Sequence, residues 1–292
     1  MTSVSDDIVD ITPDNAVTPV GTVPVPVVAK REGRGWRGWL ITVGPPLLVA
    51  LAAIGLWYAY SGFVLTANER NISLPYAHDV WRVGFWNAEN RGELLDALWV
   101  STKVSMVGLV ISMVLGIVVA VAMSQAAWIE RSFYPYAVLL QTVPILALVP
   151  LIGLRFGFGF NARVLVVVII SLFPIITNTL FGLKSADQGH HDLFTLHNAD
   201  RWTRLRKLQF PAAVPAMFTG FQISAGLSVI GAIVGDFFFG RGEQGLGLRI
   251  KEYTSRLKSE QLIAAIILSA LLGIVVFEFF GWLKQRLIRE WH

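Results

Sequence analysis

Six long apolar stretches, separated by shorter polar segments, are the main pattern in the sequence. A helix needs about 20 mostly apolar residues to cross the hydrocarbon core of a bilayer, and each stretch reaches or approaches that length. The pattern therefore predicts an all-α integral membrane protein with six transmembrane helices. The predicted spans cover approximately residues 39–60, 100–123, 133–153, 163–183, 212–235 and 261–283.

Prolines interrupt the first, third and fourth of these spans. Membrane helices tolerate proline where neighbouring groups satisfy the carbonyls that it frees. We therefore expect kinks or broken helices at these points. The prolines are Pro45, Pro46, Pro135, Pro144, Pro150 and Pro174.

The composition supports a membrane protein and excludes several other classes. Of the 292 residues, 54% are hydrophobic and 15% are charged, and the mean hydropathy is +0.59. This excludes a disordered, collagen-like or coiled-coil chain. The absence of cysteine excludes a disulfide scaffold, thiolate catalysis and iron–sulfur clusters. The net charge of +4 lies mainly beside apolar segments, where it sets topology or meets anionic lipid rather than nucleic acid.

The ends of the chain differ in composition from its middle. Residues 1–35 begin with aspartates and a Pro/Val run, which predicts a disordered cytoplasmic tail and not a cleavable signal peptide. A basic collar from Lys30 to Arg37, with Trp36 and Trp39, then anchors the first span. We assign the first transmembrane helix and an extracytoplasmic loop to 36–95. A core with five further transmembrane helices follows at 96–285, and a cytoplasmic C-terminal tail at 286–292.

An even number of spans places both termini on the same side of the membrane. The basic collar indicates the cytoplasmic side, because lysine and arginine accumulate in cytoplasmic segments. Thirteen of the 24 Lys and Arg residues fall on that side, although a basic group from Arg241 to Lys258 falls on the other. We find no internal repeat, which disfavours the architectures of secondary transporters.

One polar segment between apolar runs, Lys184 to Pro215, has a helical pattern of its own. Trp202, Leu205 and Leu208 recur at a spacing of three, which predicts an amphipathic helix. Asn198 precedes that helix, and asparagine enters the left-handed backbone region more readily than most residues. The segment therefore predicts a helix, a sharp turn at Asn198 and a second helix. We call residues 185–210 the elbow; its rigid shape suits docking of another protein.

The sequence LHNADRWTRLRKLQFPAAVP, followed by TGFQISAGLSVIGAIVGDFFFGRGEQGLG, resembles permeases of bacterial ATP-binding-cassette (ABC) importers with the type I fold. The resemblance covers about 95–285 and is to the branch that serves nitrate, sulfonate and taurine, and also thiamine precursors and riboflavin. It differs from the family pattern in four places. Asp192 to Leu196 replaces a Glu-Ala-Ala start, Asn198 a glycine, Phe210 a leucine and Asp236 a glutamate.

The resemblance implies a permease subunit in the bacterial inner membrane with three kinds of partner. These are a second permease copy or close paralogue, cytoplasmic ABC ATPases and an extracytoplasmic substrate-binding protein. ATP and Mg²⁺ would be bound by the ATPase, and this chain would hold no cofactor. By position, the ATPase-coupling residues would be Leu193, Leu196, His197, Asn198, Ala199, Asp200, Trp202 and Leu205. An amphipathic helix on lipid headgroups is the alternative.

Five polar residues in or beside the spans are candidates for the translocation path: Thr142, Asn178, Gln222, Ser224 and Asp236. An acid inside a span is costly, so Asp236 either belongs to the path or a hydrogen-bonded gate, or lies in water at the outer interface. Serine beside Gly220, Gly226 and Gly231 is equally typical of close helix packing. Polar groups near prolines also satisfy freed carbonyls.

Other chemistry has little support. The group His190, His191, Asp192 and His197 lacks the spacing of a metal site, and the glycine-rich GRGEQGLG matches no phosphate loop. We expect no catalytic residues and no metal. The rival functions are an ATP-independent secondary transporter or channel, for which Asp236 and Glu278 are the sole intramembrane acids we find, and a membrane enzyme using the His190–His197 region. The sequence leaves two classes of solute open, a flat heteroaromatic molecule and an anion.

Overall fold

The computed structural model describes residues 36–240 and 242–289, so the predicted tail at 1–35 lies outside the described residues. The chain divides into two compact units, Met1–Ala52 and Ala53–His292. Helix α1 (Trp36–Ala59) begins in the first unit and ends in the second, and it contains Pro45 and Pro46. A short π-helical turn, η1 (Tyr60–Val64), extends it. All further description concerns the second unit.

The predicted loop before the second span consists of short helices. These are α2 (Ala67–Ile72), α3 (Ala77–Val80) and the π-helical η2 (Trp81–Trp86). Thr66 begins α2 with a reciprocal cap, in which its side chain and that of Glu69 each bond the other's backbone amide. The indole of Trp57 donates to the Pro75 carbonyl at 2.9 Å, which fixes the segment to the end of α1.

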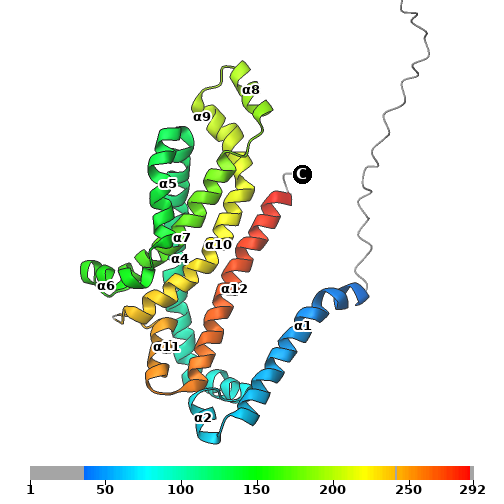
Figure 1. Cartoon of the computed structure of the whole chain (residues 1–292), viewed down its shortest axis with the longest axis vertical. Coiled ribbons are helices and arrows are strands. Elements are labelled where there is room, and N and C mark those ends of the chain that lie inside the picture. The colour runs from blue at the N-terminus through cyan, green and yellow to red at the C-terminus, as the bar shows by residue number, and fades with distance from the viewer. Residues whose placement is uncertain (1–35, 241, 290–292) are drawn as a thin grey trace, which may run out of the picture. The chain divides into compact units, whose positions relative to one another are not determined.

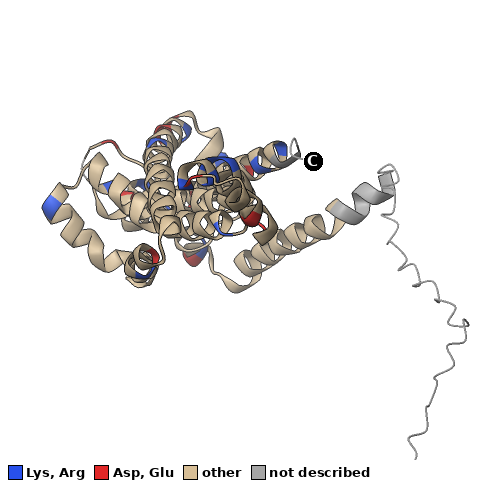
Figure 2. Cartoon of the chain, turned by 90° about the horizontal axis from the view of Figure 1, so that it is seen from above, with Lys and Arg blue, Asp and Glu red and all other residues tan. Residues whose placement is uncertain are grey.

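Four long helices form the main bundle: α4 (Ala88–Gln125), α7 (Phe160–Leu183), α10 (Phe210–Phe238) and α12 (Ser259–Arg289). They run side by side in Figure 1. Seen along the bundle in Figure 2, most of the helical ribbon is neither acidic nor basic. Helix α4 begins well before the predicted start at residue 100. Helix α12 continues to Arg289, into the segment 286–292 that was predicted as a tail.

The third predicted span is not one continuous helix. It is divided into α5 (Ala127–Thr142) and α6 (Ile145–Phe156), which are bent by 99° relative to each other. Pro144 lacks a backbone N–H and forces Val143 into an extended conformation, so the helix ends before it. Five described helices are therefore long and apolar enough to cross a membrane, or six spans if the bent pair counts as one.

Small residues bring α7 and α10 close together. A Cβ on Gly220 would lie 2.9 Å from the Pro174 carbonyl, and one on Gly231 would lie 3.0 Å from the Val167 Cα. These two glycines serve the close helix packing that the sequence suggested, whereas Gly226 faces Phe277 of α12. The α7–α10 contact forms the centre of the bundle.

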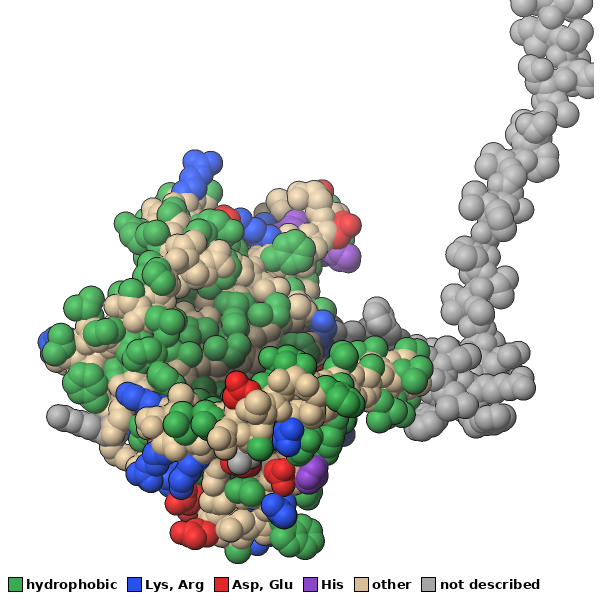
Figure 3. All heavy atoms as spheres, turned by 60° about the horizontal axis from the view of Figure 1, so that its bottom comes forward, with side chains coloured by type: hydrophobic (Ala, Val, Ile, Leu, Met, Phe, Trp, Pro, Cys, Tyr) green, Lys and Arg blue, Asp and Glu red, His purple; other side chains and the backbone are tan. Residues whose placement is uncertain are grey.

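The second half of the elbow continues into helix α10 of the bundle. Helix α8 (Gln188–Leu196) is followed by α9 (Arg201–Arg204), then the π-helical η3 (Leu205–Gln209), which leads directly into α10. The run Arg201–Phe238 is a single helical stretch of 38 residues. At the opposite end lies α11 (Leu246–Ser255). Figure 3 shows charged side chains gathered over that end and hydrophobic ones over the adjoining helices.

Candidate functional site

The turn of the elbow has the geometry that the sequence predicts. Asn198 has a φ of 51°, in the left-handed region. The backbone N–H of Ala199 donates to the Phe194 carbonyl at 3.0 Å, which closes the end of α8. Asp187 caps the start of α8, with its carboxylate accepting from Gly189 N at 2.7 Å, and Asp200 caps the start of α9.

Side chains hold the two halves of the elbow together and fix the end of α7, from which the elbow starts. Arg204 donates to the Thr195 hydroxyl at 3.1 Å, which joins α9 to α8. Lys184, at the end of α7, pairs with Glu130 of α5. Hydrogen bonding from the Thr203 side chain lowers the pKa of Asp200, so this cap stays charged at neutral pH. The elbow is therefore a defined structure and not a loose loop.

The structure exposes most of the predicted coupling residues. The exposed fraction is 51% for Leu193, 79% for Leu196 and 68% for Trp202. His197, Asn198 and Asp200 are exposed as well, and Ala199 is half-buried. The elbow thus presents two leucines and a tryptophan to its surroundings, next to the exposed cations Arg201, Arg206 and Lys207.

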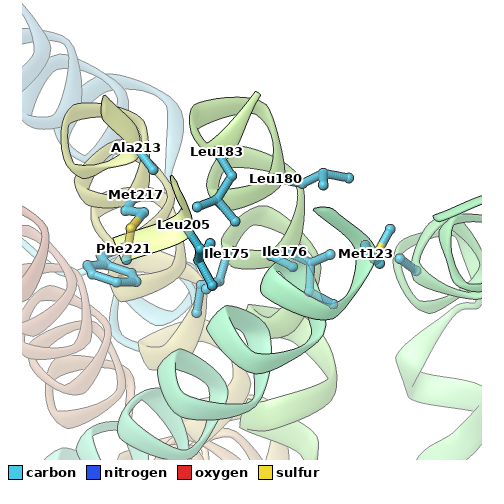
Figure 4. Packing of buried hydrophobic residues seen from close by; sticks show 11 residues of the cluster. Met123, Ile175, Ile176, Leu180, Leu183, Leu205, Ala213, Met217 and Phe221 are labelled. Atoms are coloured by element: carbon cyan, nitrogen blue, oxygen red, sulfur yellow. The ribbon is translucent and has the colours of Figure 1, made fainter. Parts of the chain in front are cut away.

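Leu205 differs from the prediction that it meets the partner with Trp202. Its exposed fraction is 5%, and it lies in the core cluster with Ile175, Met217 and Phe221 (Figure 4). Leu205 begins the π-helical turn, and it is about 60° from Trp202 around the helix at 100° per residue. That offset turns it from the exposed face toward α7. Leu205 therefore anchors the elbow in the bundle.

The five predicted path residues do not come together. Thr142 is exposed at the α5–α6 break, where its hydroxyl donates to the Leu139 carbonyl. Asn178 donates to the Pro174 carbonyl at 2.8 Å, and Ser224 is buried and donates to the Ser171 carbonyl at 2.7 Å. Gln222 is half-buried and faces Gly281 of α12. Asn178 and Ser224 thus have packing roles between or within helices.

Asp236 lies in a buried ion pair at the α11 end of the bundle, which excludes the alternative of an acid in open water. Its carboxylate is 2.7 Å from Arg163 Nη1, and the side chains are 0% and 2% exposed. Ser101 Oγ of α4 donates to Asp236 Oδ2 at 2.7 Å and accepts from Leu246 N at 2.9 Å. The pair therefore links α4, α7, α10 and α11.

The same network fixes the glycine-rich connection between α10 and α11. Arg163 donates to the carbonyls of Phe239, at 2.9 Å, and Glu243, at 2.7 Å. A Cβ on Gly245 would lie 1.7 Å from Asp236 Oδ2. Glycine at 245 is required by this close approach and not by any phosphate-binding role. We call Ser101, Arg163, Asp236 and Gly245 the Asp236 network.

A groove between α10 and α12 is a feature that the sequence analysis did not single out. Its volume is about 650 Å³, and Ile223, Ile230, Ile274, Phe277 and Glu278 are among its lining residues. The sequence placed Glu278 near the inner end of the sixth span but gave no sign that α10 lies beside it. The pairing of the two helices depends on tertiary packing.

The chain is similar in sequence to membrane components of transport systems. A family model described as the binding-protein-dependent transport system inner membrane component matches residues 112–289. The formylaminopyrimidine transport permease protein ThiX of Halalkalibacterium halodurans is 35% identical over 59% of this chain and 68% of its own length. The putative aliphatic sulfonates transport permease protein SsuC of Bacillus subtilis is 25% identical over 90% of this chain and 91% of its own.

A solved structure shares the fold. The crystal structure of an amino acid ABC transporter with histidines superposes with a TM-score of 0.55 at 17% sequence identity. The match covers 68% of this chain and 95% of that one.

Proposed function

This chain belongs to the family of binding-protein-dependent transport system inner membrane components, and we propose that its elbow docks a cytoplasmic ATPase. It is a multi-pass membrane permease subunit of an ABC importer. In the proposed assembly, the ATPase binds ATP and Mg²⁺, and this chain supplies no catalytic residue. A second permease copy and an extracytoplasmic substrate-binding protein complete the importer.

The exposed pair Leu196 and Trp202 is the observation that supports docking at the elbow. Exposed aromatic and large apolar side chains, such as these two, are typical of the centre of a protein interface. Cations beside them are typical of its rim. The elbow continues into α10 without a break, so a movement of the docked ATPase would reach the bundle. Nucleotide-driven closure of two ATPases would then switch the access of the path from one side to the other.

Co-purification tests the proposal. We expect a tagged chain, isolated in mild detergent from its native cell, to retain an ATPase with a nucleotide-binding domain. Leu196→Ala combined with Trp202→Ala should reduce the retained ATPase at least tenfold. Trp86→Ala is the matched control, because Trp86 is 76% exposed at the opposite end of the bundle. Transport without ATP by the chain alone would contradict the proposal and favour a secondary transporter or channel.

The orientation follows from the same proposal. An elbow that meets a cytoplasmic ATPase must lie on the cytoplasmic side, and the C-terminal end of α12 lies at the elbow end of the bundle (Figure 1). We propose that both termini are cytoplasmic. ThiX is named for a formylaminopyrimidine and SsuC for aliphatic sulfonates, so the names of relatives leave two solute classes for this chain.

A further inference from the structure

Glu278 is a charged side chain in a position where lipid would disfavour it. It lies on α12, inside the candidate span Ser259–Leu287, and is exposed on the surface of this single chain. Arg163 and Asp236 neutralise each other, but the Glu278 carboxylate has no hydrogen bond or ion pair to the described part of the chain. Ionisable residues within spans usually face a protein interior or a water-filled cavity.

The groove that Glu278 lines has the size and composition of a small-molecule site. Its volume of about 650 Å³ falls within the range of roughly 300–1,000 Å³ that is usual for ligand pockets. Apart from Glu278 and Ser269, its lining is apolar or glycine. Such sites combine an apolar wall with a few polar groups that set orientation and specificity.

Among the described residues that line the groove, Glu278 is the one charged side chain. Neither lysine nor arginine is among the described residues that line it. Lys284, two turns along α12, donates to the Thr219 hydroxyl of α10 at 2.8 Å and is held there. The Gln222 amide lies one turn from Glu278, since a Cβ on Gly281 would be 2.7 Å from its Nε2. An ionised carboxylate accepts hydrogen bonds and donates none.

We propose that in the assembled importer the α10–α12 groove faces the transport path, and that Glu278 makes it selective for small solutes that are cationic or present N–H donors. Amino-substituted heterocycles have this chemistry. Sulfonates and nitrate are anions and would be repelled. The inference rests on the proposed function, because the groove needs the assembled importer to enclose it.

The absence of cysteine from the natural sequence allows a direct test. Ile274 lies one turn from Glu278, lines the same groove and is 58% exposed, so Ile274→Cys places a single thiol there. The importer, purified with its ATPase and returned to vesicles, is treated with two methanethiosulfonate reagents of similar size. One carries a trimethylammonium group and the other a sulfonate. The measured quantity is the rate of thiol modification by each reagent.

We expect the cationic reagent to react at least tenfold faster than the sulfonate at Ile274→Cys. Adding Glu278→Gln should reduce this preference to less than threefold, whereas Glu278→Asp should keep it. Val118→Cys on α4, 60% exposed, is the control for a position in contact with lipid and should react slowly with both reagents.

Three results would overturn the inference. Equal rates, or a faster reaction with the sulfonate, would show that Glu278 does not select for cations. No reaction with either reagent would show that lipid or a second copy covers the groove. A preference for the cationic reagent that persists in Glu278→Gln would show that another residue causes it. Failure of the proposed function is separate, because it would appear as loss of the ATPase during purification.

Discussion

At the scale of single residues, Asp236 and Arg163 depend on each other. Moving one charge out of water is costly, and the cost is offset by an opposite charge at 2.7 Å together with hydrogen bonds from Ser101 and to two carbonyls. Both residues lie within a turn or so of helix ends. Their pairing therefore stabilises the end of the bundle where α10 leaves the core and α11 begins.

Removing one partner of this buried ion pair should cost far more stability than removing one partner of an exposed pair. We expect Asp236→Asn to lower the free energy of unfolding by about 3–5 kcal/mol, because the Arg163 charge stays buried without its carboxylate. Glu243→Gln is the control, since Glu243 pairs with Lys103 at the surface and should contribute about 1 kcal/mol or less. Thermal unfolding of both variants in detergent measures the difference. Equal losses would contradict the buried pair.

The sequence could identify Asp236 as unusual but not its partner. Arg163 stands at the start of a predicted span, where a cation is ordinarily an interfacial anchor. The two residues are far apart in the sequence, and the α7–α10 packing that joins them depends on small residues such as Gly235, whose Cβ would lie 3.2 Å from Arg163 Cα. The helical periodicity of the sequence does not indicate which residues of two helices form such a pair.

At the scale of elements, the elbow has an exposed face and an anchored face. Leu196 and Leu205 are the same residue type in one elbow, but they are 79% and 5% exposed. The turn at Asn198 could be predicted because it rests on a local backbone preference. The burial of Leu205 could not, since it depends on the π-helical turn and on contacts with α7 and α10.

This difference predicts opposite effects for one substitution at two positions. Leu205→Ala should lower the free energy of unfolding by about 2–5 kcal/mol, because it opens a cavity in the core cluster. Leu196→Ala should change it by no more than about 0.5 kcal/mol and should weaken ATPase retention instead. Thermal unfolding and co-purification of each variant separate the two roles. A stable Leu205→Ala protein would show that Leu205 is not an anchor.

Local rules also explain where the element boundaries were predicted correctly. The fourth span, predicted at 163–183, matches α7 because its apolar run ends at the polar segment that starts the elbow. The third span was predicted to kink or break at its prolines, and the break between α5 and α6 lies at Pro144. The 99° angle between α5 and α6 is set by packing of Val149 and Ile152 against Val166 and Phe239, which no local rule contains.

At the scale of the whole molecule, α10 connects the two functional ends. Its 29 residues, at about 1.5 Å each, give it a length of about 44 Å, with the elbow at its start and Asp236 in its last turn. The α10–α12 groove lies between these ends. A single helix thus joins the proposed ATPase contact, the proposed solute groove and the Asp236 network. Alternating access by rigid-body movement requires such a connection.

This arrangement makes the orientation of the chain testable. If the elbow is cytoplasmic, the start of α4 is extracytoplasmic, because α4, α7 and α10 each cross the bundle between the two ends (Figure 1). Leu196→Cys and Glu89→Cys place single thiols at exposed positions of the two ends in a chain without natural cysteine. An impermeant maleimide added to spheroplasts should label Glu89→Cys and spare Leu196→Cys.

Inside-out vesicles from which the ATPase has been removed should give the reverse pattern of labelling. The basic group from Arg249 to Lys258 would then lie outside, against the usual preference of lysine and arginine for the cytoplasm. Two of its arginines are bound locally, since Arg249 pairs with Glu93 and Glu252 and Arg256 with Glu252. Their charge is thereby neutralised in the folded protein. Labelling of Leu196→Cys from the outside would show that the elbow is extracytoplasmic. The elbow could then not contact a cytoplasmic ATPase.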